Sequence, residues 1–394
     1  MSRIFVTGMG MVSAIGNSIA DNRHALMQGT SGISKPQFFS SKYSDIPMGE
    51  VKTDTESLRE ELGAWEQGVT RTMLLALKAF KEAIEDAEIS FSSLTDETTS
   101  LVNASTVGGM CLTDELYNDA NKHSNGSEFL ASYDTASVSL YLQARYGLKG
   151  IINTINTACS SSANAILYGA RLIKSGIARR AIVGGVDSLA KFTVNGFNAL
   201  HILSSGICSP FDEQRNGLNL GEGAAFLILE REEDLHGKKV YAELTGYGNA
   251  NDAYHPSSLS PNGDGPYLAM KKAVDCLPAG ASMIDLINAH GTGTENNDEV
   301  ESRAMLRLFK SPPAFVSTKA ATGHTLGAAG AIEAAYAVLN LHHQEVYASL
   351  NFKQPISSTG LTPVLNYEKA ALKNVMSNSF GFGGNCTSLI FSKV

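Results

Sequence analysis

The 394-residue chain lacks the patterns that mark several large classes of protein. Its five cysteines are an odd number at scattered spacings, which excludes a regular disulfide framework and favours reduced thiols. No apolar run reaches the roughly 20 residues of a membrane-spanning helix, and the N-terminus is typical of a strand, not of a signal peptide. These absences predict a cytoplasmic protein.

An excess of positive charge is also missing. The formal net charge of −8 argues against a nucleic-acid-binding or anionic-membrane role. With 43% hydrophobic and 18% charged residues, the chain can bury a large core. It is long enough for two domain-sized halves.

Cys159 lies between a strand-like run at 151–155 and a small-residue stretch, from Ala163 on, that is typical of a helix. A tight turn from strand to helix places the thiol at a helix N-terminus. Unpaired backbone N–H groups and the helix dipole favour an anion there, so the pattern predicts a nucleophile with a stabilised thiolate near neutral pH. An inert, buried cysteine is the alternative.

Two histidines follow predicted strands elsewhere in the chain. His290 comes after the apolar run 284–287, and His324 lies in a Gly-rich segment that opens a helix after the short strand 315–316. Reactive groups collect at strand ends in α/β sheets. Each histidine alone could be structural, and a zinc site lacks the short paired ligand spacings, so we expect no metal. A thiol, two imidazoles and the nearby Lys319 suit acyl transfer better.

A weak internal repeat bears on the architecture. The paired segments are 4–10 with 242–248, 156–159 with 317–320, and 217–229 with 380–391. Three matched landmarks in the same order predict two copies of one α/β unit, at 1–236 and 237–394.

Gly8 and Gly10 also invite comparison with a dinucleotide-binding loop. The third glycine position holds Ser13, and no acidic residue closes a second strand at the expected distance. We therefore predict that these glycines serve tight packing of a strand against a helix.

The segments around Cys159, His290 and Lys319–His324, together with 377–385, resemble the β-ketoacyl-acyl carrier protein synthases of the thiolase superfamily. The likeness covers essentially the whole chain. It implies an α/β thiolase fold, duplicated, with five αβαβα layers and a helix pair buried in the middle. Helices covered on both sides must be small or apolar all round, as 163–173 and 326–338 are.

The resemblance also implies roles for individual residues. Cys159 would take the acyl group, its backbone N–H and that of Phe382 would form the oxyanion hole, and Lys319 would act through its charge. His290 and His324 would bind the malonyl thioester or assist loss of carbon dioxide. The implied supporting residues are Glu333 as partner of Lys319, and Asp298 and Glu301 beneath the His290 loop. The implied substrate-binding residues are Val107, Ser257, Thr292, Thr294 and Phe380.

The implied reaction is a decarboxylative Claisen condensation between a Cys-bound acyl chain and malonyl-acyl carrier protein, as in fatty-acid elongation. No cofactor is expected beyond the phosphopantetheine arm of the acyl carrier protein, and a homodimer is expected. Small and β-branched, Val107 predicts acceptance of medium to long acyl chains. A basic docking patch for the acidic carrier protein could draw on Lys122, Lys174, Arg179 and Arg180.

Three alternatives stay open. Gly293 and the segment 295–298 depart from many fatty-acid members, which leaves a specialised polyketide or aryl-polyene pathway, with a heterodimer in place of the homodimer. A catalytically silent partner subunit is disfavoured because Cys159 is present. A degradative thiolase would use a second cysteine near the C-terminal glycine loop, where Cys386 lies.

Overall fold

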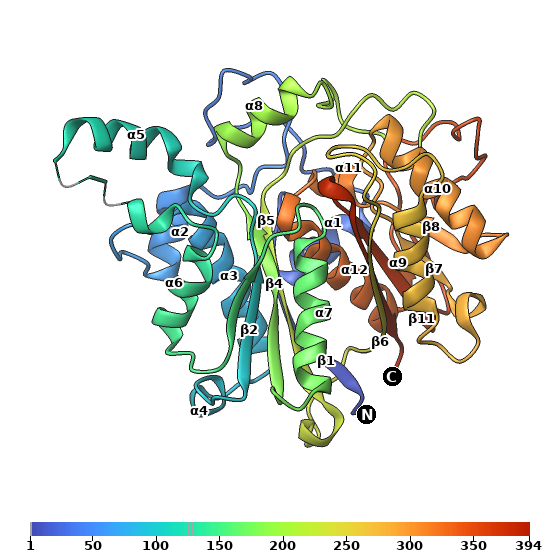
Figure 1. The fold of residues 1–394 in the computed structure, drawn as a ribbon, viewed down its shortest axis with the longest axis horizontal. Coiled ribbons are helices and arrows are strands. Elements are labelled where there is room, and N and C mark those ends of the chain that lie inside the picture. The colour runs from blue at the N-terminus through green and yellow to red at the C-terminus, as the bar shows by residue number, and fades with distance from the viewer. Residues whose placement is uncertain (1, 125, 128) are drawn as a thin grey trace.

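The computed structural model describes residues 2–124, 126–127 and 129–394. Ten strands pair in the order β3-β2-β4-β5-β1-β6-β12-β11-β7-β8 (Figure 1). Those of the first half are β1 (Ile4–Val12), β2 (Thr99–Ala104), β3 (Ile152–Ile155), β4 (Arg180–Asp187) and β5 (Gly223–Arg231). Those of the second half are β6 (Ala242–Asn251), β7 (Leu286–Asn288), β8 (Ala314–Val316), β11 (Asn374–Phe380) and β12 (Asn385–Ser392). A separate short pair is formed by β9 (Glu345–Val346) and β10 (Glu368–Lys369).

The strand order repeats within the chain. Outward from the centre, each half places its first, fifth, fourth, second and third strands in that sequence, with the same parallel and antiparallel pairings. The halves join where β1 pairs with β6 through two residue pairs, Phe5 with Glu243 and Val6 with Ala242. This repetition agrees with two copies of one unit; the boundary between 1–236 and 237–394 stays a prediction.

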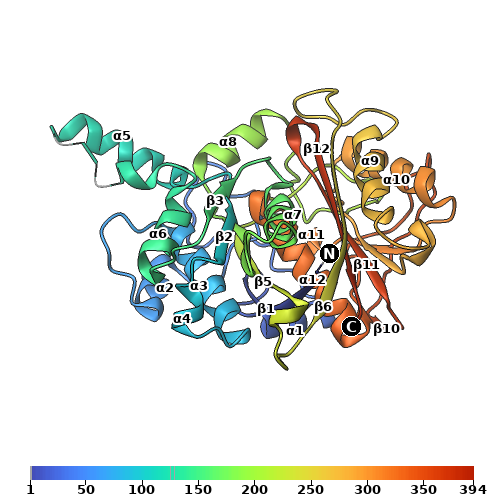
Figure 2. The same cartoon turned by 60° about the horizontal axis from the view of Figure 1, so that its bottom comes forward.

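Two helices, α7 (Ser161–Lys174) and α12 (Ala329–His343), lie between the halves (Figures 1 and 2). Each contacts strands of both halves, and every residue of α12 as far as Leu341 is buried. Small side chains permit the close approach: a Cβ atom added at Gly330 would lie 2.9 Å from the Cβ of Ala163. The middle layer is therefore the predicted buried helix pair.

Other helices form the outer layers. On the first half α3 (Arg71–Asp86) packs against β1 and β5, and on the second α9 (Asp264–Val274) packs against β6 and β12 with α10 (Glu295–Phe309) beside it. The predicted αβαβα architecture is confirmed. The remaining helices are α1 (Ile19–Met27), α2 (Thr55–Leu62), α4 (Phe91–Leu94), α5 (Thr113–Lys122), α6 (Ser137–Tyr146), α8 (Lys191–Ala199) and α11 (Lys319–Thr322).

The glycines of the first strand of each half serve packing. A Cβ atom at Gly10 would lie 2.1 Å from the carbonyl oxygen of Ala79 in α3, and one at Gly248 would lie 2.1 Å from that of Ala269 in α9. No side chain fits at such a distance, so the strand can approach its helix only as glycine. The packing explanation is confirmed, and it applies to both halves.

Helix α5 projects from the body of the protein (Figures 1 and 2). In the segment 112–133, which includes α5 and which the sequence predicts as a polar surface excursion or cap, Asn125 and Glu128 fall outside the described residues. Within the described part of the chain, every helix is too short or too polar to cross a membrane.

Candidate active site

Cys159 lies in the turn between β3 and α7. Ala158 adopts a left-handed backbone conformation (φ = 54°), which bends the chain sharply before the helix begins. The Gly381 segment packs directly on this turn, because a Cβ atom there would lie 3.0 Å from the backbone nitrogen of Cys159. Phe382, the next residue, directs its backbone N–H at the thiol. Both predicted oxyanion-hole donors therefore lie beside the sulfur.

A network of asparagines holds the Cys159 turn, and the sequence did not predict it. The Oδ1 atom of Asn385 accepts hydrogen bonds from the Ser160 hydroxyl (2.8 Å), the Asn164 amide (2.8 Å) and the Asn249 amide (3.0 Å). Ser160 and Asn164 belong to the start of α7, Asn249 to β6 and Asn385 to β12. The network therefore ties the nucleophile to the second half. The available signal was polar residues on otherwise apolar elements.

His290 follows β7 and is fixed by the buried Lys319. The Nζ atom of Lys319 donates to His290 Nδ1 (3.2 Å), to the His290 carbonyl oxygen (2.5 Å) and to Glu333. An ammonium group cannot accept a hydrogen bond, so Nδ1 is the acceptor and the neutral ring carries its hydrogen on Nε2. The predicted pairing of Lys319 with Glu333 is present as a buried ion pair.

His324 is oriented in the same way by the backbone. Its Nδ1 atom accepts from the Leu326 N–H (3.1 Å), which again leaves the hydrogen on Nε2. The two imidazole centroids are 5.3 Å apart at 83°. Burial, and then the charge of Lys319, lower the pKa of both rings well below the usual value. Both are therefore neutral hydrogen-bond donors at physiological pH.

The pKa of the Cys159 thiol differs from the prediction. Burial raises the pKa of Cys159 to about 11, although the Phe382 N–H and the Lys319 charge act in the opposite direction. The predicted stabilised thiolate near neutral pH is wrong for the resting site. A helix N-terminus contributes only about 0.3–1 kcal/mol to an adjacent anion, and the loss of hydration in this enclosed turn outweighs it.

Two buried carboxylates support the His290 loop. Glu301 accepts from the backbone N–H groups of His290 and Gly291, both at 2.9 Å. Asp298 accepts from the N–H groups of Thr292 (2.8 Å), Gly293 (3.0 Å) and Phe211 (2.7 Å). Neither carboxylate is among the residues that line the cavity, so both act through the loop.

A cavity of about 400 Å³ opens beside the sulfur. Its lining includes Cys159, His290, His324 and Phe382, and four of the predicted substrate-binding residues, namely Ser257, Thr292, Thr294 and Phe380. The Phe382 ring stacks on Phe197, which the sequence did not suggest, with centroids 5.7 Å apart.

Val107 is the exception among the predicted substrate-binding residues. It is fully buried in an apolar cluster with Met48, Leu218 and Leu326, and it does not line the open cavity. An acyl pocket that reaches Val107 is therefore closed in this structure.

Cys386 does not line the cavity either: it is buried in β12, and its thiol donates to the Gly384 carbonyl. This placement removes the support for a two-cysteine thiolase site.

Cys159, His290 and His324 each offer one ligand atom, all within 4.8 Å of one another. Such a set suits Zn²⁺ in its chemistry. The Lys319 ammonium, however, bonds directly to His290 and opposes a divalent cation beside that ring. The prediction of no resident metal is therefore kept as a prediction.

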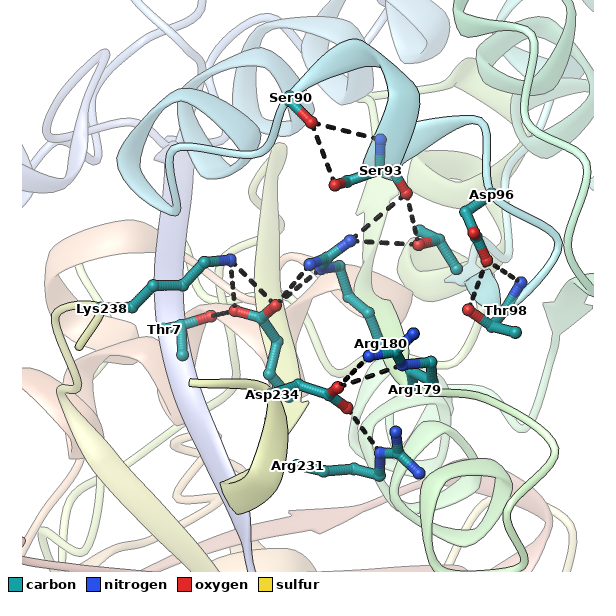
Figure 3. A network of polar contacts seen from close by, with 12 residues as sticks. Thr7, Ser90, Ser93, Asp96, Thr98, Arg179, Arg180, Arg231, Asp234 and Lys238 are labelled. Carbon is teal, nitrogen blue, oxygen red and sulfur yellow. Dashed lines mark hydrogen bonds and ion pairs between the residues drawn. The ribbon is translucent and has the colours of Figure 1, made fainter. Parts of the chain in front are cut away.

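The suggested basic patch does not form at the cavity. Arg179 and Arg180 follow the C-terminal end of α7, about 20 Å from the Cys159 end for a helix of this length. Both are engaged in an ion-pair network (Figure 3). Arg179 pairs with Asp234, and Arg180 joins Lys238 on the buried Glu230. Lys174 lies over the Tyr247 ring at that same end, and Lys122 ends the projecting α5.

Comparison with known proteins identifies the scaffold. The model of the N-terminal domain of beta-ketoacyl synthase matches residues 1–235, and that of the C-terminal domain matches residues 241–353. A putative mitochondrial 3-oxoacyl-[acyl-carrier-protein] synthase from Schizosaccharomyces pombe is 35% identical over 100% of this chain and 99% of its own length. The 3-oxoacyl-[acyl-carrier-protein] synthase 2 of Coxiella burnetii is 32% identical over 100% and 99%.

Among solved structures, a ketosynthase in complex with its chain length factor from Xenorhabdus doucetiae superposes with a TM-score of 0.88. It is 30% identical, and the match covers 100% of this chain and 98% of that one. This likeness supports the assignment of the predicted fold.

Proposed function

The chain belongs to the β-ketoacyl synthase family, as its resemblance predicted, and from that premise we propose that it condenses an acyl chain with malonyl-acyl carrier protein in fatty-acid elongation. The observation that carries the proposal is the convergence of one thiol and two neutral N–H-donating imidazoles on a single cavity. That arrangement suits two successive thioester reactions.

In the first reaction, Cys159 takes the acyl group. Its sulfur attacks the thioester carbonyl of the acyl-carrier protein, the carbon–sulfur bond to the phosphopantetheine breaks, and the carrier thiol leaves with the proton. The N–H groups of Cys159 and Phe382 beside the sulfur stabilise the oxyanion of the tetrahedral intermediate. Because the resting thiol is neutral, its proton must be lost as the carbon–sulfur bond forms.

In the second reaction, malonyl-carrier protein enters the vacated cavity. The Nε2–H groups of His290 and His324 donate to its thioester carbonyl, which gains negative charge as carbon dioxide departs. The enolate carbon attacks the acyl-Cys159 carbonyl, the carbon–sulfur bond to Cys159 breaks, and the leaving sulfur takes up a proton from solvent to restore the neutral thiol. The product is a β-ketoacyl-carrier protein two carbons longer.

Partners and compartment belong to the same proposal. An acyl carrier protein brings both substrates, no further cofactor takes part, and the enzyme is a cytoplasmic homodimer, although the S. pombe relative carries a mitochondrial name. The second candidate is a specialised polyketide or aryl-polyene ketosynthase in a heterodimer. It is favoured by the likeness to a ketosynthase that is paired with a chain length factor.

Chain length is proposed from Val107. As part of the closed apolar cluster behind the cavity, this small residue leaves room for medium to long acyl chains once the Phe197–Phe382 stack opens. A Val107→Phe variant is expected to retain short-chain activity and lose long-chain activity. Unchanged long-chain elongation would contradict this assignment.

The test is an elongation assay followed by mass spectrometry. Purified protein receives malonyl-carrier protein and a panel of saturated and polyunsaturated acyl-carrier proteins, with Cys159→Ala as the control. Extension of saturated chains by two carbons, lost in the control, supports fatty-acid elongation. Activity on polyene chains alone, or only with an added partner subunit, supports the specialised pathway.

A further inference from the structure

Asp187, at the end of β4, is a buried carboxylate that the reaction above does not use. Its Oδ1 atom accepts from the Ser105 hydroxyl and from the backbone N–H groups of Thr106 and Val107, each at 2.8 Å. Its Oδ2 atom accepts from the Thr106 hydroxyl (2.5 Å) and the Gly327 N–H (2.7 Å). Five donors converge on one side chain, and only a carboxylate can accept from all of them.

These donors come from two segments far apart in the sequence. Residues 105–107 form the loop after β2, and Val107 in that loop lies in the closed apolar cluster behind the cavity. Gly327 lies in the 3₁₀ turn Leu326–Ala328, directly after His324. The first residue of that turn, Leu326, holds His324 through its N–H and also belongs to the same apolar cluster as Val107. Asp187 thus joins the wall of the apolar cluster to the segment that orients a catalytic imidazole.

The second half contains a matching device. The loop after β7, the counterpart of β2, is held by Glu301 and Asp298, which accept from successive backbone N–H groups of His290 to Gly293. In each half, therefore, a buried carboxylate fixes the loop at the end of the second strand. Like Asp187, Asp298 also bonds to the other half, because it accepts from the N–H of Phe211.

We propose that Asp187 is a positioning residue that sets acyl-chain selectivity and links the Val107 loop to the His324 turn. The inference deepens, and rests on, the proposed condensing function. An amide in place of the carboxylate would direct an N–H group at two of the five donors and release one or both segments. The Val107 wall would then discriminate less between chain lengths, and His324 would be held less firmly.

The experiment compares Asp187→Asn with Asp234→Asn. Asp234 is also a buried carboxylate, but it pairs with Arg179 and Arg231 near the far end of α7. Acylation of Cys159 by six-carbon and sixteen-carbon acyl-carrier proteins is followed by intact mass, and carbon dioxide release from malonyl-carrier protein is measured separately. For Asp187→Asn we expect the ratio of the two acylation rates to move at least fivefold toward 1, and decarboxylation to fall at least tenfold. Asp234→Asn should change the ratio of the two acylation rates by less than twofold, and the rate of decarboxylation by less than twofold.

Milder variants decide the matter if Asp187→Asn does not fold. Thr106→Val removes one of the five donors, and Thr106→Ser keeps it. The valine variant should shift the acylation ratio in the same direction as Asp187→Asn, and the serine variant should restore the wild-type ratio. An acylation ratio that stays within twofold of wild type in Asp187→Asn, or in Thr106→Val where the first does not fold, would overturn this inference alone. Wild-type protein that no acyl-carrier protein acylates would overturn the proposed function and this inference together.

Discussion

The two halves of the molecule have one strand order but carry different chemistry at equivalent positions. After the third strand of the unit, the first half places Cys159 and the second places Lys319 and His324. After the second strand, the first half places the Val107 loop and the second places His290. With the reaction proposed above, the first half holds the acyl chain and the second handles the malonyl group. The strand order is therefore shared, whereas the strand-end loops differ.

The central helices differ in the same way. In α7, Asn164 belongs to an uncharged amide network with Asn249 and Asn385. In α12, Glu333 forms a buried ion pair with Lys319. The nucleophile of the first half is therefore fixed by neutral hydrogen bonds to side chains of the second half, whereas His290 is oriented by a cation. A cation beside the histidines suits a step in which negative charge develops.

The largest expected effect separates the two half-reactions. Cys159→Ala should lower the rate of acylation at least ~10³-fold. It should keep the rate of malonyl decarboxylation within about tenfold of wild type, because the nucleophile takes no part in the loss of carbon dioxide. His290→Ala should do the reverse. Intact-mass acylation and carbon dioxide release measure the two steps. Equal loss of decarboxylation in both variants would break the proposed division between the halves.

A smaller effect concerns the central ion pair. Glu333→Gln leaves the Lys319 ammonium buried without its carboxylate and should lower the free energy of unfolding by about 3–5 kcal/mol. At pH 6, Lys319→Met should lower the free energy of unfolding by less than Glu333→Gln does. Burial raises the pKa of Glu333 to about 7, so the carboxylate left without its partner can bind a proton and become neutral.

The pH dependence follows from the sign of that shift. A carboxyl whose folded-state pKa lies above its unfolded value stabilises the fold below that unfolded value and loses the contribution as pH rises through the folded pKa. The wild type shares this dependence, but Lys319→Met also removes the charge and hydrogen bond that lower the pKa of Glu333. Its loss of stability relative to wild type should therefore be greater at pH 8 than at pH 6, as measured by chemical denaturation. The hydrogen-bond network of Asn164 on α7 contains no titratable group. Asn164→Ala should therefore lower the free energy of unfolding by about 1–3 kcal/mol, and this loss should not depend on pH. Identical pH profiles for the Lys319 and Asn164 variants would show that the helices do not differ in this respect.

The shared packing of the halves gives a symmetrical test. Gly10→Ala and Gly248→Ala each place a methyl group 2.1 Å from a helix carbonyl oxygen, so both should lower the free energy of unfolding by about 1–3 kcal/mol. Gly206→Ala is the control, because nothing lies within 4 Å of its added Cβ atom, and it should change stability by less than about 0.5 kcal/mol. A large difference between the two glycine variants would mean that one half tolerates movement of its outer helix.

The sequence predicted the parts that depend on local pattern. The strand, turn and helix around Cys159, the placement of His290 and His324 at strand ends, and the duplicated landmarks all lie in short contiguous segments. The burial of Glu333 could be predicted as well, because the residues around it are apolar, whereas its pairing with Lys319 was implied by the family resemblance.

Long-range side-chain contacts could not be predicted in this way. Asp187 meets donors from Ser105 to Gly327, and Asn385 meets donors from Ser160 to Asn249, so no sequence window contains either set. Val107 was placed on the pocket by the family resemblance, whereas in the structure it lies in a closed apolar cluster against which Phe197 packs. The thiol pKa depends on enclosure by the second half, which the helix terminus alone does not report.

That last difference can be measured through the reactivity of the thiol. With the pKa of Cys159 raised to about 11, the thiolate is a small minority at pH 7, and its fraction grows about tenfold per pH unit until the pKa is approached. The rate of alkylation by iodoacetamide should rise accordingly from pH 7 to 10 without a plateau. Cys276→Ser serves as the background, because Cys276 is exposed and would react as well; Cys159→Ala in that background measures the remaining cysteines. A plateau near pH 7 would mean that the helix terminus and Lys319 outweigh burial, and that the first half presents a ready anion. A continued rise would mean that the resting nucleophile is a neutral thiol. Both imidazoles carry a hydrogen on the nitrogen that faces the cavity, so neither can accept the thiol proton, and the thiol would lose it only as the sulfur attacks a bound thioester.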